Sequence, residues 1–114
     1  MAKVMEKLFS YGTLREANVQ EAVFGRRIEG RADAVVGYRL VPVTISDERA
    51  IAISGRPGHT ILEETDNPAD AVEGMVFTLS AEDLARADAY EDAAYKRAAL
   101  PLRSGGSAWV YVKA

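Results

Sequence analysis

The sequence predicts a small α+β domain built on a mixed, mostly antiparallel sheet that is closed or strongly curled. Three observations support this fold class. The chain has 114 residues, the size of one domain. Predicted strands outnumber predicted helices, and most connections between them are short. We therefore expect about six strands and two flanking helices in a single domain over residues 1–114.

The N-terminal part of the chain predicts a strand followed by a helix. Residues 6–11 are apolar enough for a strand, which Gly12 ends. Residues 15–24 are rich in good helix formers, and Gly25 is a suitable stop signal. The apolar residues at helical spacing in this segment are Val19, Ala22 and Val23.

The central part of the chain predicts extended structure. Residues 28–43 are expected to form one long strand, because residues 28–36 alternate with a period close to two. Gly37 is expected to bend or bulge this strand, and Pro42 restricts its end to a sheet edge. Two shorter strands are expected at residues 50–53 and 59–63, separated by a loop rich in Gly and Pro.

The C-terminal part predicts a strand, a capped helix and a hairpin. Residues 71–79 form the strand, and Ser80 begins the helix because its hydroxyl can accept from the first-turn N–H groups. The negative charge of Asp83 lies near the positive N-terminal end of the helix dipole and stabilises the helix. The helix is expected to end at Tyr90 or Glu91. The strands of the hairpin are residues 95–102 and 108–112.

Composition excludes several classes of protein. Without cysteine the chain has no disulfide, no thiolate nucleophile and no cysteine-based zinc site. The net charge of −3 and the absence of a basic run longer than Arg26-Arg27 give no reason to expect a nucleic-acid partner. No apolar run approaches the roughly 18 residues of a membrane span, and the first residues do not resemble a signal peptide. We expect a cytoplasmic protein.

The first candidate site is the segment Tyr11-Gly12-Thr13-Leu14. An apolar strand ends in a Tyr-Gly pair, where glycine lets the backbone turn without steric penalty. A loop that runs into a helix N-terminus points unpaired N–H groups outward, which suits a carboxylate or an oxyanion. The alternative is a plain strand-to-helix turn in which Thr13 caps the helix.

The second candidate is Glu91, at the predicted end of the second helix. Leu84, Ala87 and Glu91 fall on one helical face, so the carboxylate is aligned with apolar residues. Partial burial raises the pKa of a carboxyl group and makes it useful as an acid/base near neutral pH. The alternative is a solvated glutamate at a frayed helix end.

Other polar residues give weaker signals. His59 is the only histidine, and it has no Ser or Asp partner by spacing, so a structural or surface role is expected. The scattered carboxylates show no metal-ligand spacing, and no phosphate loop or dinucleotide fingerprint is present. We therefore expect neither a metal nor a cofactor.

Taken in order, the motifs resemble the γ-glutamylcyclotransferase-like (AIG2-like) family. Residues 8–14 are similar to its N-terminal substrate loop, and residues 73–79 to its "Gly-x-Val-Tyr-x-Leu" strand, with Phe for the usual Tyr. Residues 87–91 match the end of its short helix, with Ala for the usual Leu. Residues 95–97 match its Tyr-x-Arg strand, and residues 109–112 its last strand.

The resemblance implies a small mixed barrel with flanking helices and one cavity. It also implies an enzyme that releases 5-oxoproline and a free amine from a γ-glutamyl amide, a small-molecule substrate, without a cofactor. Glu91 corresponds to the family's catalytic glutamate. The implied substrate-binding residues are Tyr11, Gly12, Thr13, Leu14 and Tyr95.

Two departures from the family pattern bear on the substrate. The segments at residues 15–18 and 92–94 both lack a glycine that many members place there. The leaving amine and the oligomeric state are therefore left open. Two alternatives remain: a non-catalytic binding or regulatory protein on the same fold, and a different amide or ester reaction such as removal of a γ-glutamyl side chain.

Overall fold

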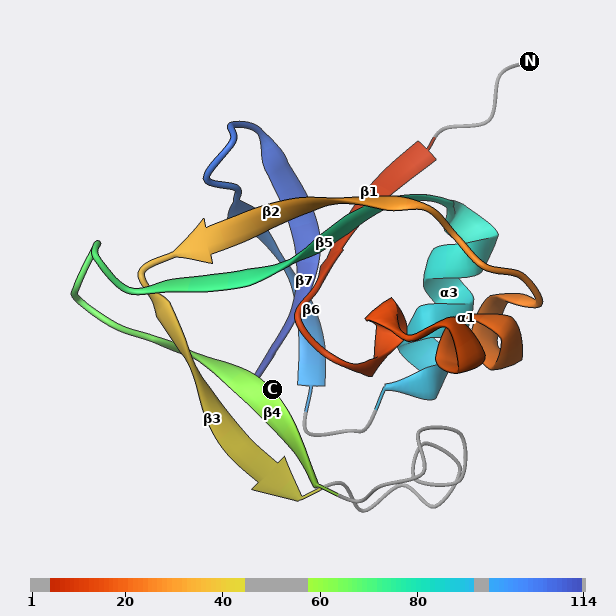
Figure 1. The fold of residues 1–114 in the computed structure, drawn as a ribbon, viewed down its shortest axis with the longest axis horizontal. Coiled ribbons are helices and arrows are strands. Elements are labelled where there is room, and N and C mark those ends of the chain that lie inside the picture. Colours follow the sequence, from red (N-terminus) through yellow and green to blue (C-terminus); the bar gives the residue numbers. More distant parts are fainter. Residues whose placement is uncertain (1–4, 45–57, 92–94, 114) are drawn as a thin grey trace.

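The computed structural model describes residues 5–44, 58–91 and 95–113 (Figure 1). The predicted strand at residues 50–53 and most of the loop after it lie outside these residues. The fold is α+β, as predicted. Its elements in chain order are β1 (Met5–Ser10), the 3-10 helix η1 (Thr13–Arg15), α1 (Ala17–Phe24), β2 (Gly30–Val36), β3 (Tyr38–Thr44), β4 (Gly58–Glu64), β5 (Ala71–Ser80), α3 (Ala81–Tyr90), β6 (Tyr95–Pro101) and β7 (Ser107–Lys113).

The strands form two sheets. The larger has the order β2-β5-β1-β7-β6, and β3 and β4 form a separate pair. Every pairing is antiparallel except that of β1 with β7, so the sheet is mixed and mostly antiparallel, as predicted. Figure 1 shows β1 in the middle of the larger sheet. The loop that follows β1 therefore leaves from the centre of the sheet.

The predicted barrel is not closed, and one glycine contributes to this. Gly37 has a φ of 85°, a left-handed conformation that favours glycine, and it divides the predicted strand at 28–43 into β2 and β3. Instead of continuing the larger sheet, β3 pairs with β4, and Pro42 lies opposite Thr60 in that pair. As predicted, Pro42 lies in an edge strand, because β3 belongs to a two-stranded sheet.

The two α-helices contact each other beside the larger sheet (Figure 1). α1 begins at Ala17, two residues later than predicted, because Arg15 belongs to η1. It ends as predicted at Gly25, which has a φ of 75°. Among the described residues, no helix combines the length and the apolar character that crossing a membrane requires.

β1 is buried on both faces because the core has two parts. Leu8 packs with residues of the helices, and the next residue, Phe9, points to the opposite face of the sheet. The helix side contains Leu8, Leu14, Val19, Phe24, Phe77, Leu79, Leu84, Ala87, Tyr90 and Tyr111. The other side contains Phe9, Tyr11, Val35, Leu62, Val72, Val76, Leu102, Ala108 and Val110.

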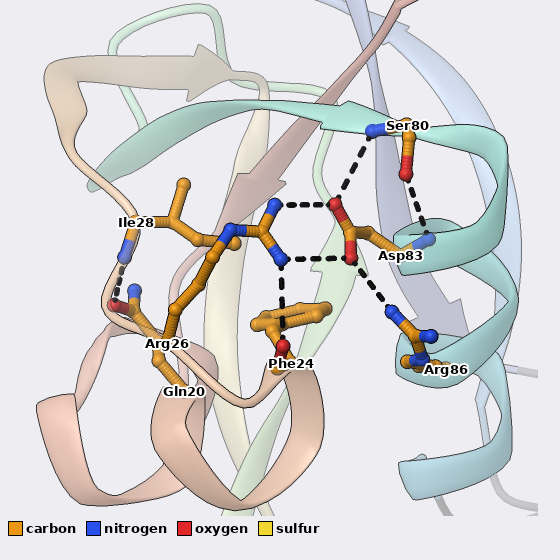
Figure 2. Close-up of polar contacts among 7 residues, drawn as sticks. All are labelled: Gln20, Phe24, Arg26, Ile28, Ser80, Asp83 and Arg86. Atoms are coloured by element: carbon orange, nitrogen blue, oxygen red, sulfur yellow. Dashed lines mark hydrogen bonds and ion pairs between the residues drawn. The ribbon is translucent and has the colours of Figure 1, made fainter.

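Asp83 fixes the start of α3 (Figure 2). Ser80 Oγ accepts from the Asp83 N–H at 3.1 Å, and the Asp83 carboxylate accepts from the Ser80 N–H, which completes the predicted capping box. The same carboxylate accepts from Arg26 at 2.7 and 3.1 Å and from Arg86 at 3.2 Å. Arg26 follows α1, so this network ties the two helices together. The hydrogen bonds from Arg26 are the main cause that lowers the pKa of Asp83 to about 2.

A second buried carboxylate holds the turn of the C-terminal hairpin. Asp33 on β2 accepts from the N–H and the hydroxyl of Ser104 and from Arg31. The hydrogen bond from the Ser104 hydroxyl is the main cause that lowers the pKa of Asp33 to about 2. The predicted hairpin of β6 and β7 is thereby attached to the edge of β2 through its turn.

Candidate active site

A cavity of about 210 Å³ lies where the loop after β1 meets the end of α3. Five of the residues proposed from the sequence line it together: Tyr11, Gly12, Thr13, Tyr95 and Glu91. The sequence did not single out the remaining lining residues, which are Phe9, Ser10, Arg15, Thr60 and Tyr111. The cavity therefore combines residues from the N-terminal, middle and C-terminal parts of the chain.

Leu14 is the one proposed residue that does not line this cavity. Its side chain is 2 % exposed and lies in the core between the sheet and the helices. Its carbonyl accepts from Gln20 Nε2 at 2.9 Å, and Gln20 Oε1 in turn accepts from the Ile28 N–H. Leu14 thus anchors the loop, and a contact with a ligand would have to come from its backbone.

Glu91 reaches the cavity from the end of α3. It is the C-cap of the helix, and its N–H donates to the carbonyl of Ala87 at 3.1 Å. Leu84, Ala87 and Tyr90 are buried, as the helical pattern predicts, and Glu91 is half-buried. A carboxylate in this place is partly withdrawn from water, unlike the solvated glutamate of the alternative prediction.

A buried hydrogen bond joins the loop to the helix residue beside Glu91. The hydroxyl oxygens of Thr13 and Tyr90 are 2.5 Å apart, and either can be the donor. The alternative prediction that Thr13 caps the helix is wrong. The N-caps of η1 and α1 are Gly12 and Glu16, and neither makes a side-chain cap hydrogen bond. Thr13 instead links the two parts of the site.

The loop that lines the cavity runs directly into η1. Gly12 has a φ of −126°, so the turn itself does not demand glycine, and a Cβ there would have nothing within 4 Å. The missing side chain at Gly12 leaves space at the cavity wall. Thr13 and Leu14 open η1, and the first N–H groups of a helix have no acceptor within it. The Gly12 N–H donates to Ser10 Oγ at 3.3 Å. Binding of an anionic group by this loop stays a prediction.

The tyrosine hydroxyls around the cavity are hydrogen bonded to the protein. Tyr11 donates to the Tyr111 carbonyl at 2.6 Å, Tyr111 donates to Asp88 at 2.7 Å, and Tyr95 donates to the Thr60 carbonyl at 2.8 Å. Burial is the main cause that raises the pKa of both Tyr11 and Tyr111 well above the ordinary tyrosine value. These two rings are therefore neutral walls of the cavity.

The charge of Glu91 acts on the same two rings. Its carboxylate is among the causes that raise the pKa of Tyr11 and of Tyr111, although it is a smaller cause than burial. Among the described lining residues, Glu91 and Arg15 carry the formal charges. Arg15 Nε donates to the Gly12 carbonyl at 3.1 Å. The cavity thus holds one carboxylate and one guanidinium against a mostly neutral wall.

Comparison with known proteins identifies the family. Residues 8–114 match the family described as gamma-glutamyl cyclotransferase, AIG2-like. The chain belongs to this family. The match spans all the residues that the sequence proposed for the site, from Tyr11 to Tyr95. A comparison of the chain with curated proteins finds no match.

Solved structures share the fold. Two solution structures of Arabidopsis thaliana proteins have TM-scores of 0.70 and 0.72 and identities of 16 % and 17 %. The alignments include 96 % and 99 % of the residues of this chain. They include 68 % and 66 % of the residues of the two Arabidopsis thaliana proteins. A structure named gamma-glutamyl cyclotransferase has a TM-score of 0.64 at 14 % identity, with 97 % of this chain and 68 % of its own covered. The chain thus spans about two thirds of the length of these structures.

Proposed function

We propose that this chain is a γ-glutamyl cyclotransferase that converts a γ-glutamyl amide into 5-oxoproline and a free amine. The observation that carries the proposal is the cavity that a half-buried Glu91 and the Tyr11–Thr13 loop line together. Membership of the gamma-glutamyl cyclotransferase, AIG2-like family supports the same reaction class.

The proposed reaction needs no protein nucleophile because the substrate contains its own. The α-amine attacks the γ-carbonyl carbon, and the new C–N bond closes a five-membered ring. The bond from this carbon to the leaving nitrogen then breaks. A cavity that holds amine and carbonyl in contact supplies much of the rate enhancement by proximity and orientation.

Glu91 is the proposed acid/base. Its carboxylate takes a proton from the α-ammonium, which frees the lone pair for attack, and returns a proton to the leaving nitrogen as the amide bond breaks. The α-nitrogen loses a second proton to solvent once the ring has closed, and the released amine takes one up from solvent. The net change is the transfer of two protons from the α-ammonium, which becomes the lactam N–H, to the leaving nitrogen, which is released as an ammonium group. Among the described residues that line the cavity, Glu91 is the one carboxylate available for this role.

The loop is the proposed binding element. The N–H groups of Gly12, Thr13 and Leu14 would hold the substrate carboxylate or the oxyanion that develops on the γ-carbonyl oxygen. The Gly12 N–H would exchange its 3.3 Å hydrogen bond to Ser10 Oγ for the ligand. Tyr11 and Tyr95 would shape the walls, because their hydroxyls already donate to backbone carbonyls. A volume of about 210 Å³ suits a glutamyl group with the leaving amine extending towards the opening. Drug-sized ligands use pockets of roughly 300–1,000 Å³.

A panel assay tests the proposal. The purified protein is incubated with γ-glutamyl amides of varied leaving amine, and both products are measured by mass spectrometry. The proposal expects 5-oxoproline and free amine in a one-to-one ratio from at least one compound. Release of glutamate in place of 5-oxoproline would indicate a hydrolase. Binding of panel members without any turnover would instead indicate a binding protein on the same fold.

A further inference from the structure

Arg15 stands apart from the other arginines of the described chain. Every other arginine in residues 5–44, 58–91 and 95–113 forms an ion pair with Asp or Glu, and Arg15 forms none. The side chain of Arg15 nevertheless lines the candidate active-site cavity. A guanidinium without a carboxylate partner among the residues that the structure describes, and beside a cavity, is suited to bind an anion from solution.

The location of Arg15 places it at the opening of the cavity. It is the last residue of η1, and it is exposed, whereas Thr13 and Leu14 before it are buried. Its Nε donates to the Gly12 carbonyl at 3.1 Å, which holds the side chain against the loop. This bond uses one N–H of the guanidinium, and the planar fork keeps further donors for a bidentate contact.

The parts of a γ-glutamyl amide differ in where they must lie. The α-amine and γ-carbonyl react at Glu91, and the α-carboxylate is one carbon away from that amine, so the glutamyl group occupies the cavity itself. In this arrangement the leaving amine is the part that extends to the opening. Arg15 lines the cavity and is exposed, so it lies on that side. A carboxylate on the leaving amine would therefore meet the guanidinium.

Resting on the proposed function, we infer that Arg15 selects substrates whose leaving amine carries a carboxylate. The favoured class is γ-glutamyl amino acids and peptides, and amines without an acidic group are disfavoured. Because Arg15 is exposed, screening by salt reduces the attraction, and the preference is expected to shrink as ionic strength rises.

Two matched substrates test the inference. γ-Glutamylglycine and γ-glutamylglycinamide differ only in a carboxylate or a neutral carboxamide at the same place. The wild type is expected to favour the first by about tenfold in kcat/KM, a typical effect for one charge-assisted hydrogen-bonded contact. In Arg15→Gln the ratio falls close to one, mainly through loss of activity on γ-glutamylglycine.

Arg27→Gln is the matched control, because it removes one positive charge from the exposed Arg27–Glu21 pair, and Arg27 does not line the cavity. It should keep the wild-type ratio. An unchanged ratio in Arg15→Gln would overturn the inference. So would an equal loss for both substrates, which would mean that Arg15 holds the glutamyl carboxylate.

A binding measurement separates this inference from the proposed reaction. Calorimetry with the two compounds compares Glu91→Gln with Glu91→Gln/Arg15→Gln, so that turnover is not required. The carboxylate compound should bind about tenfold more tightly, and only when Arg15 is present. Equal affinities would contradict the role of Arg15. Absence of 5-oxoproline from the wild type would overturn the reaction alone.

Discussion

The hydroxyls of Thr13 and Tyr90 meet in a buried hydrogen bond of 2.5 Å that spans the candidate active site. Thr13 belongs to the loop that follows the central strand, and Tyr90 is the last residue of α3, directly before Glu91. The bond therefore sets the position of the proposed acid/base relative to the proposed binding loop. Neither residue needs to contact the reacting atoms for this effect.

Removal of the Tyr90 hydroxyl should impair turnover more than substrate binding. Tyr90→Phe keeps the ring in the core but leaves the Thr13 hydroxyl buried without this partner, which costs about 1–2 kcal/mol of the free energy of unfolding. Since Glu91 is then less well placed, kcat should fall by about fivefold, with a smaller change in KM. Steady-state kinetics and urea unfolding measure the two effects.

A double-mutant cycle checks that the effect belongs to the pair. Thr13→Val with Tyr90→Phe should cost less than the sum of the single changes, because each single change already removes the hydrogen bond between the two hydroxyls. Tyr38→Phe is the control, since Tyr38 is partly buried on β3 and does not line the cavity. Strict additivity of the two changes would contradict a direct coupling.

Gly12 and Gly74 should respond in opposite ways to substitution by alanine. A Cβ on Gly12 has nothing within 4 Å, so Gly12→Ala should change the free energy of unfolding by less than about 1 kcal/mol. The added methyl group takes space at the cavity wall and should reduce kcat/KM by at least about tenfold. Thermal unfolding and the 5-oxoproline assay measure the two properties.

Gly74→Ala provides the contrast. Its Cβ would collide with the Ser10 carbonyl and lie 2.6 Å from the ring of Phe9, so overpacking should destabilise the fold by about 1–3 kcal/mol or more. A stable Gly74→Ala together with a fully active Gly12→Ala would show that the packing around β1 is described wrongly.

Stability should fall in acid between about pH 4 and pH 2. The folded pKa values of Asp83 and Asp33 are both about 2, below the ordinary 3.8. A lowered folded pKa means that the unfolded chain binds protons more readily, so the stabilisation is complete above the unfolded pKa and is lost as pH falls towards 2. Urea midpoints across this range should therefore decline.

Asp83→Asn should remove part of this pH dependence. At neutral pH it should also cost about 1–2 kcal/mol, because the helix start and the two arginines lose their carboxylate. Asp66→Asn is the control, since Asp66 is exposed. An acid transition of Asp83→Asn that coincides with that of the wild type would show that Asp83 does not contribute.

The sequence was informative wherever a local signal decides the structure. The capping box at Ser80 and Asp83 and the helix stop at Gly25 depend on neighbouring residues, and the structure has both. The long strand at 28–43 was wrong as one element. Residues of high strand propensity lie on both sides of Gly37, so the pattern could not show that the backbone turns left-handed there and moves to another sheet.

The site was only partly predictable for a related reason. The loop and Glu91 were proposed from their local patterns and from their resemblance to family motifs, and the structure brings them to one cavity. Thr60 and Tyr111 look like ordinary strand residues, and only the tertiary fold shows that they line it. No pattern in the sequence distinguishes Arg15 from the other arginines, and only the tertiary fold shows that it lines the cavity. Leu14 was proposed from the motif as a binding residue, but its side chain packs in the core and does not line the cavity.

The most direct test of the central claim is the rate of 5-oxoproline release by Glu91→Gln, measured beside the wild type and Glu29→Gln. The change to Gln keeps the shape of Glu91 but removes its ability to carry the proton, and Glu29 is an exposed glutamate that does not line the cavity. We predict that Glu91→Gln stays folded and loses at least about a hundredfold in rate, while Glu29→Gln is unchanged. A folded Glu91→Gln that releases 5-oxoproline at the wild-type rate would contradict the proposed role of Glu91.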